Sequence, residues 1–190
     1  MSSQLLVLAL LGLVLAVYAG IALRAYFRMR GTRVVVCPET HQPVAVKVDA
    51  AHAAATAVWE KPDLALKACT RWPERQDCDQ ACTAQIAAAP EETLVFQMAR
   101  RHFAEKACAL CRRPLPALTH AGPQPGLLDA ASPGREIVVW DEIPAESLPA
   151  AFESHLPVCS NCQVAESFRR QFPDLAIDRK PHDNPGVSVH

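Results

Sequence analysis

Eight cysteines, four of them in two identical short spacings, constrain this chain more than any other feature. The two spacings are Cys108-x-x-Cys111 and Cys159-x-x-Cys162. Two such pairs brought together place four sulfur ligands around one ion, the tetrahedral arrangement that Zn²⁺ prefers in structural sites. The other four cysteines can build a second site of the same kind: Cys37, Cys69, Cys78 and Cys82. Aromatic residues make up only 6% of the chain, so we expect small modules with thin cores that metal ions stabilise.

An apolar run of membrane length precedes all the cysteines. Residues 4–23 carry no formal charge, and a helix of that length reaches about 30 Å, the thickness of the hydrocarbon core. A cleaved signal peptide is the alternative, since Val17, Tyr18 and Ala19 can form a cleavage site. The run has no Lys or Arg before it and exceeds a usual signal core, which favours a retained transmembrane anchor in contact with the lipid bilayer.

Arginines follow the apolar run closely and predict its orientation. Arg24, Arg28, Arg30 and Arg33 lie within ten residues of it, and residues 1–33 contain no acidic residue. Because positive flanks stay on the cytoplasmic side, we expect a single-pass membrane protein whose C-terminal region is cytoplasmic. Thiols remain reduced there, so metal binding is favoured over disulfides. The opposite topology would instead give an exported protein stapled by disulfides.

The charge of the remaining chain and its motifs exclude several functions. Beyond residue 33 there are 20 acidic and 15 basic residues, a formal charge of −5, which does not suit a nucleic-acid partner. No glycine-rich phosphate loop, HExxH, GxSxG or EF-hand motif is present. The sequence therefore predicts a protein that is not an enzyme.

Residues 34–90 are predicted to form a first cysteine module. The β-branched runs 34–36 and 44–48 indicate a hairpin with Cys37 near its tip. After the hairpin, Asp49 is a predicted N-cap for an alanine-rich helix over residues 50–60.

A second helix of this module would carry two of its cysteines. Asp77 or Asp79 can cap a helix running to about residue 89. Cys78 and Cys82 would then lie one turn apart on one face, where both can bind a single ion. Cys69 and Cys37 would complete the set of ligands.

Residues 91–172 are predicted to form a second cysteine module. A helix is expected to open at Pro90, with two acidic residues in its first turn, and to stop near Lys106. Its apolar side would comprise Leu94, Val95, Met98, His102 and Phe103.

The rest of this module alternates loops with short elements. Residues 112–134 are rich in Pro and Gly and predict loop or short irregular strand, while residues 135–140 predict a strand. A short helix is expected over 147–155, and Cys162 leads directly into a helix over 163–172.

A CxxC turn, a β segment and a second CxxC that opens a helix resemble a zinc ribbon or treble-clef finger over residues 108–172. The resemblance implies that Cys108, Cys111, Cys159 and Cys162 hold one Zn²⁺. The 47 residues between the pairs exceed the roughly 15–20 of a compact finger. The pairs therefore bind one ion across an insertion, or they bind separately.

Other thiol chemistries find less support in the sequence. Neither CxxC is followed by His, as covalent haem attachment would require, and no βαβ pattern suggests a thioredoxin-like dithiol. An iron–sulfur cluster remains an alternative cofactor, because four thiolates also hold such clusters.

Together these patterns predict an α+β protein with a single N-terminal transmembrane helix and two small metal-stabilised cysteine modules. The predicted boundaries are 1–33 for the anchor, 34–90 and 91–172 for the modules, and 173–190 for a disordered tail. The predicted function is a membrane-anchored zinc protein with two sites, acting as a scaffold or docking subunit of a membrane-protein complex or another protein partner. A membrane-tethered iron–sulfur electron carrier and an exported disulfide-stapled protein are the alternatives.

Overall fold

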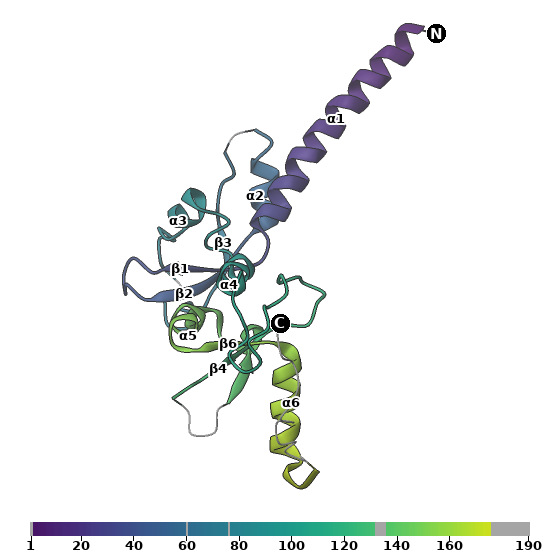
Figure 1. Ribbon diagram of the computed structural model, residues 1–190. Helices are drawn as coiled ribbons and strands as arrows, with labels where there is room; N and C mark the ends of the chain where they lie inside the picture. Colours follow the sequence, from purple (N-terminus) through teal and green to yellow (C-terminus); the bar gives the residue numbers. More distant parts are fainter. Residues whose placement is uncertain (1, 60, 76, 132–135, 176–190) are drawn as a thin grey trace, which may run out of the picture.

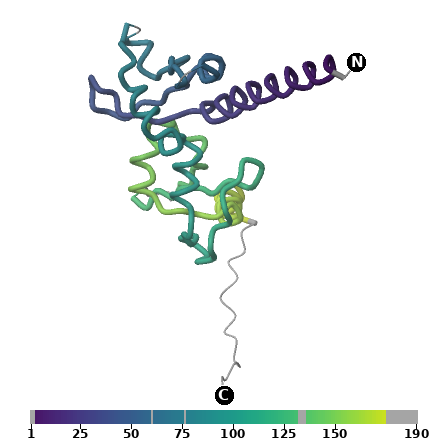
Figure 2. Tube along the Cα trace, turned by 90° about the horizontal axis from the view of Figure 1, so that it is seen from above, coloured from purple at the N-terminus to yellow at the C-terminus, as the bar shows by residue number. Residues whose placement is uncertain are grey.

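A single long helix, α1 (Ser2–Met29), extends away from the rest of the chain (Figures 1 and 2). The computed structural model describes residues 2–59, 61–75, 77–131 and 136–175. The side chains of α1 are exposed from Ser3 to Ile21, whereas Ala25 and Met29 near its end are buried. By length and composition α1 can cross a membrane, and a signal sequence near an N-terminus would meet the same criteria.

The first sheet follows α1 directly and consists of β1 (Thr32–Val36), β2 (Pro43–Val48) and β3 (Leu66–Cys69), in that order. Both pairings are antiparallel, and Val35 lies opposite Val44. The predicted hairpin is therefore confirmed, with Cys37 immediately after β1.

Two short helices accompany this sheet: α2 (Ala50–Thr56) and α3 (Thr83–Ala88). Asp49 caps α2 as predicted, since its Oδ1 accepts hydrogen bonds from the N–H groups of Ala51 and His52 at 3.1 and 3.0 Å. Turns already replace helix at residues 57–59, and Glu60, the predicted last residue of α2, lies outside the described residues.

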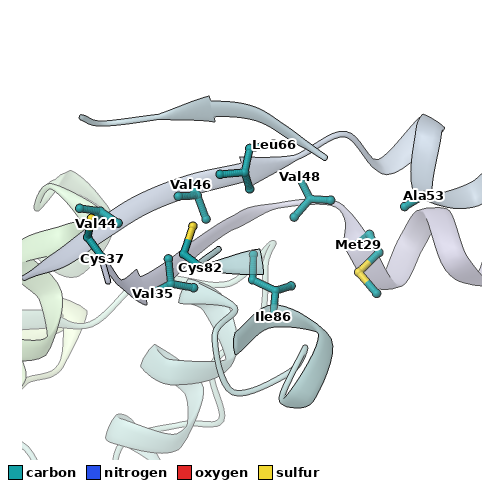
Figure 3. Close-up of a cluster of buried hydrophobic side chains, with 10 residues drawn as sticks. All are labelled: Met29, Val35, Cys37, Val44, Val46, Val48, Ala53, Leu66, Cys82 and Ile86. Atoms are coloured by element: carbon teal, nitrogen blue, oxygen red, sulfur yellow. The ribbon is translucent and has the colours of Figure 1, made fainter. Parts of the chain in front are cut away.

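The core of this half lies between the sheet and three helices. It contains Met29 of α1, Ala53 of α2 and Ile86 of α3, together with valines of β1 and β2. Figure 3 shows Cys37 and Val44 at one end of this cluster and Met29 and Ala53 at the other. The last turn of α1 is thus part of the folded core.

The second sheet is built later in the chain from β4 (Gly126–Leu128), β5 (Ile137–Val139) and β6 (Leu156–Val158), in the order β5-β4-β6 and all antiparallel. The strand predicted over 135–140 is confirmed as β5, and its first residue lies outside the described part. Strand β4 lies within the region predicted as loop or short strand.

Helices of the second half are α4 (Val95–Phe103), α5 (Leu148–Ser154) and α6 (Ser160–Gln171). Short 3-10 helices are η1 (Trp140–Glu142), η2 (Ala145–Ser147) and η3 (Pro173–Leu175). The short helix expected over 147–155 is confirmed as α5. The tail predicted to be disordered lies outside the described residues from residue 176 onward.

Helix α4 begins later than predicted, because the segment before it pairs with β1. The N–H of Val34 donates to the carbonyl of Thr93 at 2.8 Å, and the buried Arg33 guanidinium donates to the carbonyl of Pro90. Arg33 and Leu94 form an antiparallel bridge. Residues 90–93 therefore form a separate turn, closed by the N–H of Thr93 on the carbonyl of Ala89 at 3.2 Å, and the bridge at Leu94 keeps this turn from continuing into α4.

Two small apolar clusters hold the second half. One gathers α4, α5 and Trp140, including Ala99, Phe103 and Leu148. The other has Cys108, Leu128, Ile137 and Val158 as its buried residues, with the partly buried Ala109, Leu115, Cys159 and Cys162 packed against them. The second cluster is small enough that its cysteine is a substantial part of it.

Candidate metal centre

A tight turn positions the first pair of cysteines. The turn spans Cys108 to Arg113, and an antiparallel bridge between Ala107 and Pro114 closes it. The N–H of Cys108 donates to the carbonyl of Arg113, and the N–H of Arg112 donates to the carbonyl of Cys108, both at 2.9 Å. Arg112 adopts a left-handed conformation with φ of 61°. The chain reverses within six residues, with Cys108 and Cys111 on the turn.

The second pair lies where β6 passes into α6. Cys159 occupies the N-cap position of α6, so Cys162 lies in its first turn, three residues further on. The helix begins three residues earlier than predicted. The N–H of Ala109 donates to the carbonyl of Pro157 at 2.8 Å, which fastens the turn to β6 beside the second pair. The 47 intervening residues therefore do not keep the two pairs apart.

The four sulfurs of Cys108, Cys111, Cys159 and Cys162 all lie within 4.8 Å of one another. The sulfurs of Cys111 and Cys159 are 3.7 Å apart, well beyond the roughly 2.05 Å of a disulfide bond. In the part of the chain that the structure describes, no other group of His, Cys, Asp or Glu side chains is gathered this closely. The resemblance to a ribbon or treble clef thus holds at the level of this cluster.

Burial of the cluster is graded. Cys108 is fully buried, Cys159 and Cys162 are half-buried, and Cys111 is exposed. The Cys108 sulfur accepts hydrogen bonds from the backbone N–H groups of Leu110, Cys111 and Cys159, the last at 3.3 Å. Backbone donors of this kind orient and stabilise a thiolate, as second-shell groups do in metal sites.

The thiols of the cluster differ in their preferred protonation. Burial raises the pKa of Cys108, but the N–H groups of Cys111, Cys159 and Leu110 outweigh it and lower that pKa to about 6. Burial and the neighbouring sulfurs raise the pKa of Cys162, and burial also raises that of Cys159. The Cys108 thiolate therefore forms readily, whereas Cys159 and Cys162 need a cation beside them to ionise.

The other predicted set is arranged differently. Cys37, Cys69, Cys78 and Cys82 line one small cavity of about 30 Å³, but they do not form a cluster as tight as the first among the described residues.

The prediction that Cys78 and Cys82 share a helix face is wrong. Helix α3 begins only at Thr83, and Gln80, between the two cysteines, has a left-handed φ of 56°. The side chain of Gln80 accepts a hydrogen bond from the N–H of Leu66 at 2.8 Å, which holds this irregular segment against β3.

Sequence reasoning missed Arg71, whose Nη1 donates to the sulfur of Cys37 at 2.9 Å and to Glu39 at 3.1 Å. Arg71 and Cys37 are 34 positions apart in the chain, so the sequence held no local signal for this contact.

The fold and the cluster together define an α+β protein with an N-terminal apolar helix and a four-cysteine site of metal-binding geometry. No family model matches the chain, and no curated protein or solved structure is similar enough to count as a match.

Proposed function

We propose that this is a membrane-anchored, non-enzymatic zinc protein that acts as a docking or scaffold subunit at the membrane. The observation that carries the proposal is the gathering of the sulfurs of Cys108, Cys111, Cys159 and Cys162 within 4.8 Å of one another. These four thiolates would hold one Zn²⁺ as a closed shell. A closed shell leaves no open position for water or substrate, so the ion has a structural role and hydrolysis is not expected.

The spacing of the sulfurs supports a single ion. With Zn–S bonds of about 2.3 Å, a tetrahedral site separates its sulfurs by roughly 3.8 Å. The separation of 3.7 Å between Cys111 and Cys159 agrees with that value. In a four-iron cluster each thiolate binds a different iron, so the sulfurs must stand apart by the width of the cluster. Four sulfurs within 4.8 Å leave room for one ion instead.

The exposed surface of α1 supports a membrane anchor. Large apolar side chains such as Leu5, Leu11 and Leu15 are more than half exposed, and lipid would cover them. Trp59 is 82% exposed, and its ring centroid lies 6.3 Å from that of Tyr18 on α1. Aromatic residues of this kind favour the membrane–water interface, which suggests that the bilayer boundary lies near Tyr18. The arginines that follow would keep the folded part on the cytoplasmic side.

One face of α6 supports a docking role. Val164, Phe168 and Phe172 are spaced by four residues and are 68%, 48% and 43% exposed. Residues at this spacing lie along one side of a helix, Phe172 being the C-cap of α6, and no side chain of α6 is fully buried. A protein partner at the membrane would cover this apolar stripe, much as a groove receives an amphipathic helix.

The proposal is tested on the full-length protein in isolated membranes. We expect it to stay in the membrane pellet at alkaline pH, to expose residues after α1 only to cytoplasmic reagents, and to contain zinc after anaerobic purification in detergent. If the purified protein is brown and contains iron and inorganic sulfide, the site holds an iron–sulfur cluster instead of zinc. A soluble, metal-free protein with oxidised thiols would overturn the proposal as a whole.

The docking role is tested by replacing Phe168 with Glu. We expect this change to abolish co-purification of a stoichiometric protein partner without loss of zinc. The matched control is Glu166→Gln, which changes a half-buried polar group on the same helix that pairs with Arg169. Equal partner recovery with Phe168→Glu and the control would contradict a docking role for this face.

A further inference from the structure

The turn after β1 has the same backbone geometry as the turn that carries Cys108. The N–H of Cys37 donates to the carbonyl of Gln42 at 2.9 Å, and the N–H of His41 donates to the carbonyl of Cys37 at 2.8 Å. Cys108 makes the same two bonds with residues at the same distances along the chain, Arg113 and Arg112. His41 also matches Arg112 in its left-handed conformation, with φ of 55°.

The surroundings of the Cys37 sulfur match as well. It accepts hydrogen bonds from the backbone N–H groups of Glu39 and Thr40, two and three residues onward, as Cys108 does from Leu110 and Cys111. Thr40 therefore stands where the first centre has its second cysteine. This turn offers one thiolate instead of two, so a metal site here needs three ligands from elsewhere.

Three further cysteines surround the same cavity. Cys69 ends β3, Cys82 directly precedes α3, and Cys78 lies in the irregular segment between them. With Cys37 they line a cavity of about 30 Å³, close to the volume of one water molecule in the liquid. A cavity of this size that four cysteines line is large enough for one ion.

Side chains around the cavity offer hydrogen-bond donors from which thiolates could accept. Arg71 already donates to the sulfur of Cys37. The buried indole N–H of Trp72, which also lines the cavity, has no hydrogen-bond partner in the described structure. Four thiolates around a divalent cation carry a net charge of −2, which Arg71 and the neighbouring Arg75 would offset. Both arginines also contact Glu39, at 3.1 and 3.7 Å.

The thiols themselves are consistent with this arrangement. Burial raises the pKa of Cys37, but hydrogen bonds from Thr40, Glu39 and Arg71 outweigh it and lower that pKa to about 7. Burial, and then the charges of the three other sulfurs, raise the pKa of Cys82 to about 11. The Cys37 thiolate therefore forms readily, whereas Cys82 needs a cation beside it to ionise.

We propose that Cys37, Cys69, Cys78 and Cys82 bind a second Zn²⁺, with Arg71 and Trp72 as outer-sphere donors to the sulfurs. The two centres share no residue. The second can therefore be tested independently of the centre that Cys108, Cys111, Cys159 and Cys162 form. It would fix the β1–β2 turn, the end of β3 and the start of α3 to one another, at the end of the core that lies opposite Met29 of α1.

The test is the zinc content of full-length protein purified anaerobically in detergent. We expect two equivalents in the native chain and one in the Cys78→Ser variant, because Cys78 lies in an irregular segment whose substitution leaves the sheet intact. The matched control is Asp77→Ser, which places the same side chain one residue earlier and should retain both equivalents. Cys159→Ser should also retain one equivalent, and the variant with both cysteine changes should retain none.

The outcomes separate the two centres. One equivalent in the native chain that Cys78→Ser leaves unchanged overturns the second centre and preserves the first. One equivalent that Cys78→Ser removes and Cys159→Ser leaves unchanged overturns the first centre and preserves the second. Alkylation of the native protein gives a second test, which does not depend on whether a variant folds. Alkylation of the native protein should spare all four cysteines of the second set until a chelator is added, and their modification before chelation would contradict the proposal.

Discussion

Replacement of Cys108 by Ser is expected to cost the second half of the protein its metal ion and much of its structure. Cys108 is the most deeply buried thiol of the cluster and the one that most readily ionises. A serine hydroxyl does not ionise near neutral pH, so the ion would lose one of its four anionic ligands. Loss of a second-shell group alone weakens metal sites by about 10- to 100-fold. We therefore expect the apparent zinc affinity to fall by at least about 100-fold, or about 2.8 kcal/mol.

The structural consequence follows from the size of the cluster that surrounds Cys108. Burial of Leu128, Ile137 and Val158 contributes about 1.5 to 3 kcal/mol each, and therefore about 5 to 9 kcal/mol together. A structural zinc ion contributes about 10 to 16 kcal/mol to small domains. A bound zinc ion would thus be the larger stabilising element here, and its loss should loosen the second sheet.

The assay has two readouts on the full-length protein in detergent. Competition with a chromogenic chelator measures the affinity, and limited proteolysis with mass spectrometry measures the opening of the chain between Cys111 and Cys159. Leu110→Ser is the matched control, because it places the same side chain in the same turn and keeps all four thiols. Equal affinity and equal protease resistance in Cys108→Ser and Leu110→Ser would refute the reasoning.

Three further predictions concern the frame around the two centres. Arg112→Gly should leave zinc binding intact and slightly raise the thermal midpoint, because the left-handed conformation is open to glycine, whereas Arg112→Val should destabilise the protein by about 1 to 2 kcal/mol; equal midpoints for the two variants would contradict this. Arg33→Met should lower the free energy of unfolding by about 2 to 4 kcal/mol, because acceptors on Pro90, Thr93 and Arg28 would lose their donor. Urea unfolding measures this change. In the control, Arg30→Met at an exposed position, the free energy of unfolding should change little. Hydrogen bonds from the N–H groups of His52 and Ala51 lower the pKa of Asp49, so the contribution of this cap to stability is complete above the unfolded pKa near 4 and disappears as pH falls through the lower folded pKa. Asp49→Ala should therefore lower the thermal midpoint at pH 7 but not at pH 2. A constant difference in midpoint across that range would argue against the cap.

Local patterns in the sequence were sufficient for several elements. Alternating β-branched runs predicted the β1–β2 hairpin, and an aspartate before an alanine-rich run predicted the cap of α2. The two CxxC spacings predicted the four cysteines that gather in the first centre. These features depend on residues close together in the chain, or on a ligand chemistry that few arrangements satisfy.

The errors arose where distant segments compete with local preference. Acidic residues after Pro90 favoured a helix, but hydrogen bonds to Arg33 and Val34 hold that segment as a turn against β1. The spacing of Cys78 and Cys82 favoured a helix face, but Gln80 reaches back to β3 and breaks the helix between them. The likeness of the Cys37 turn to the Cys108 turn was hidden because threonine replaces the second cysteine.

The most direct test of the central claim is X-ray absorption at the zinc edge, measured on anaerobically purified full-length Cys78→Ser protein, in which the centre of Cys108, Cys111, Cys159 and Cys162 is intact. The account predicts one zinc ion per chain with four sulfur neighbours at about 2.3 Å. A protein without zinc, or a zinc ion with nitrogen or oxygen neighbours in place of these sulfurs, would contradict it.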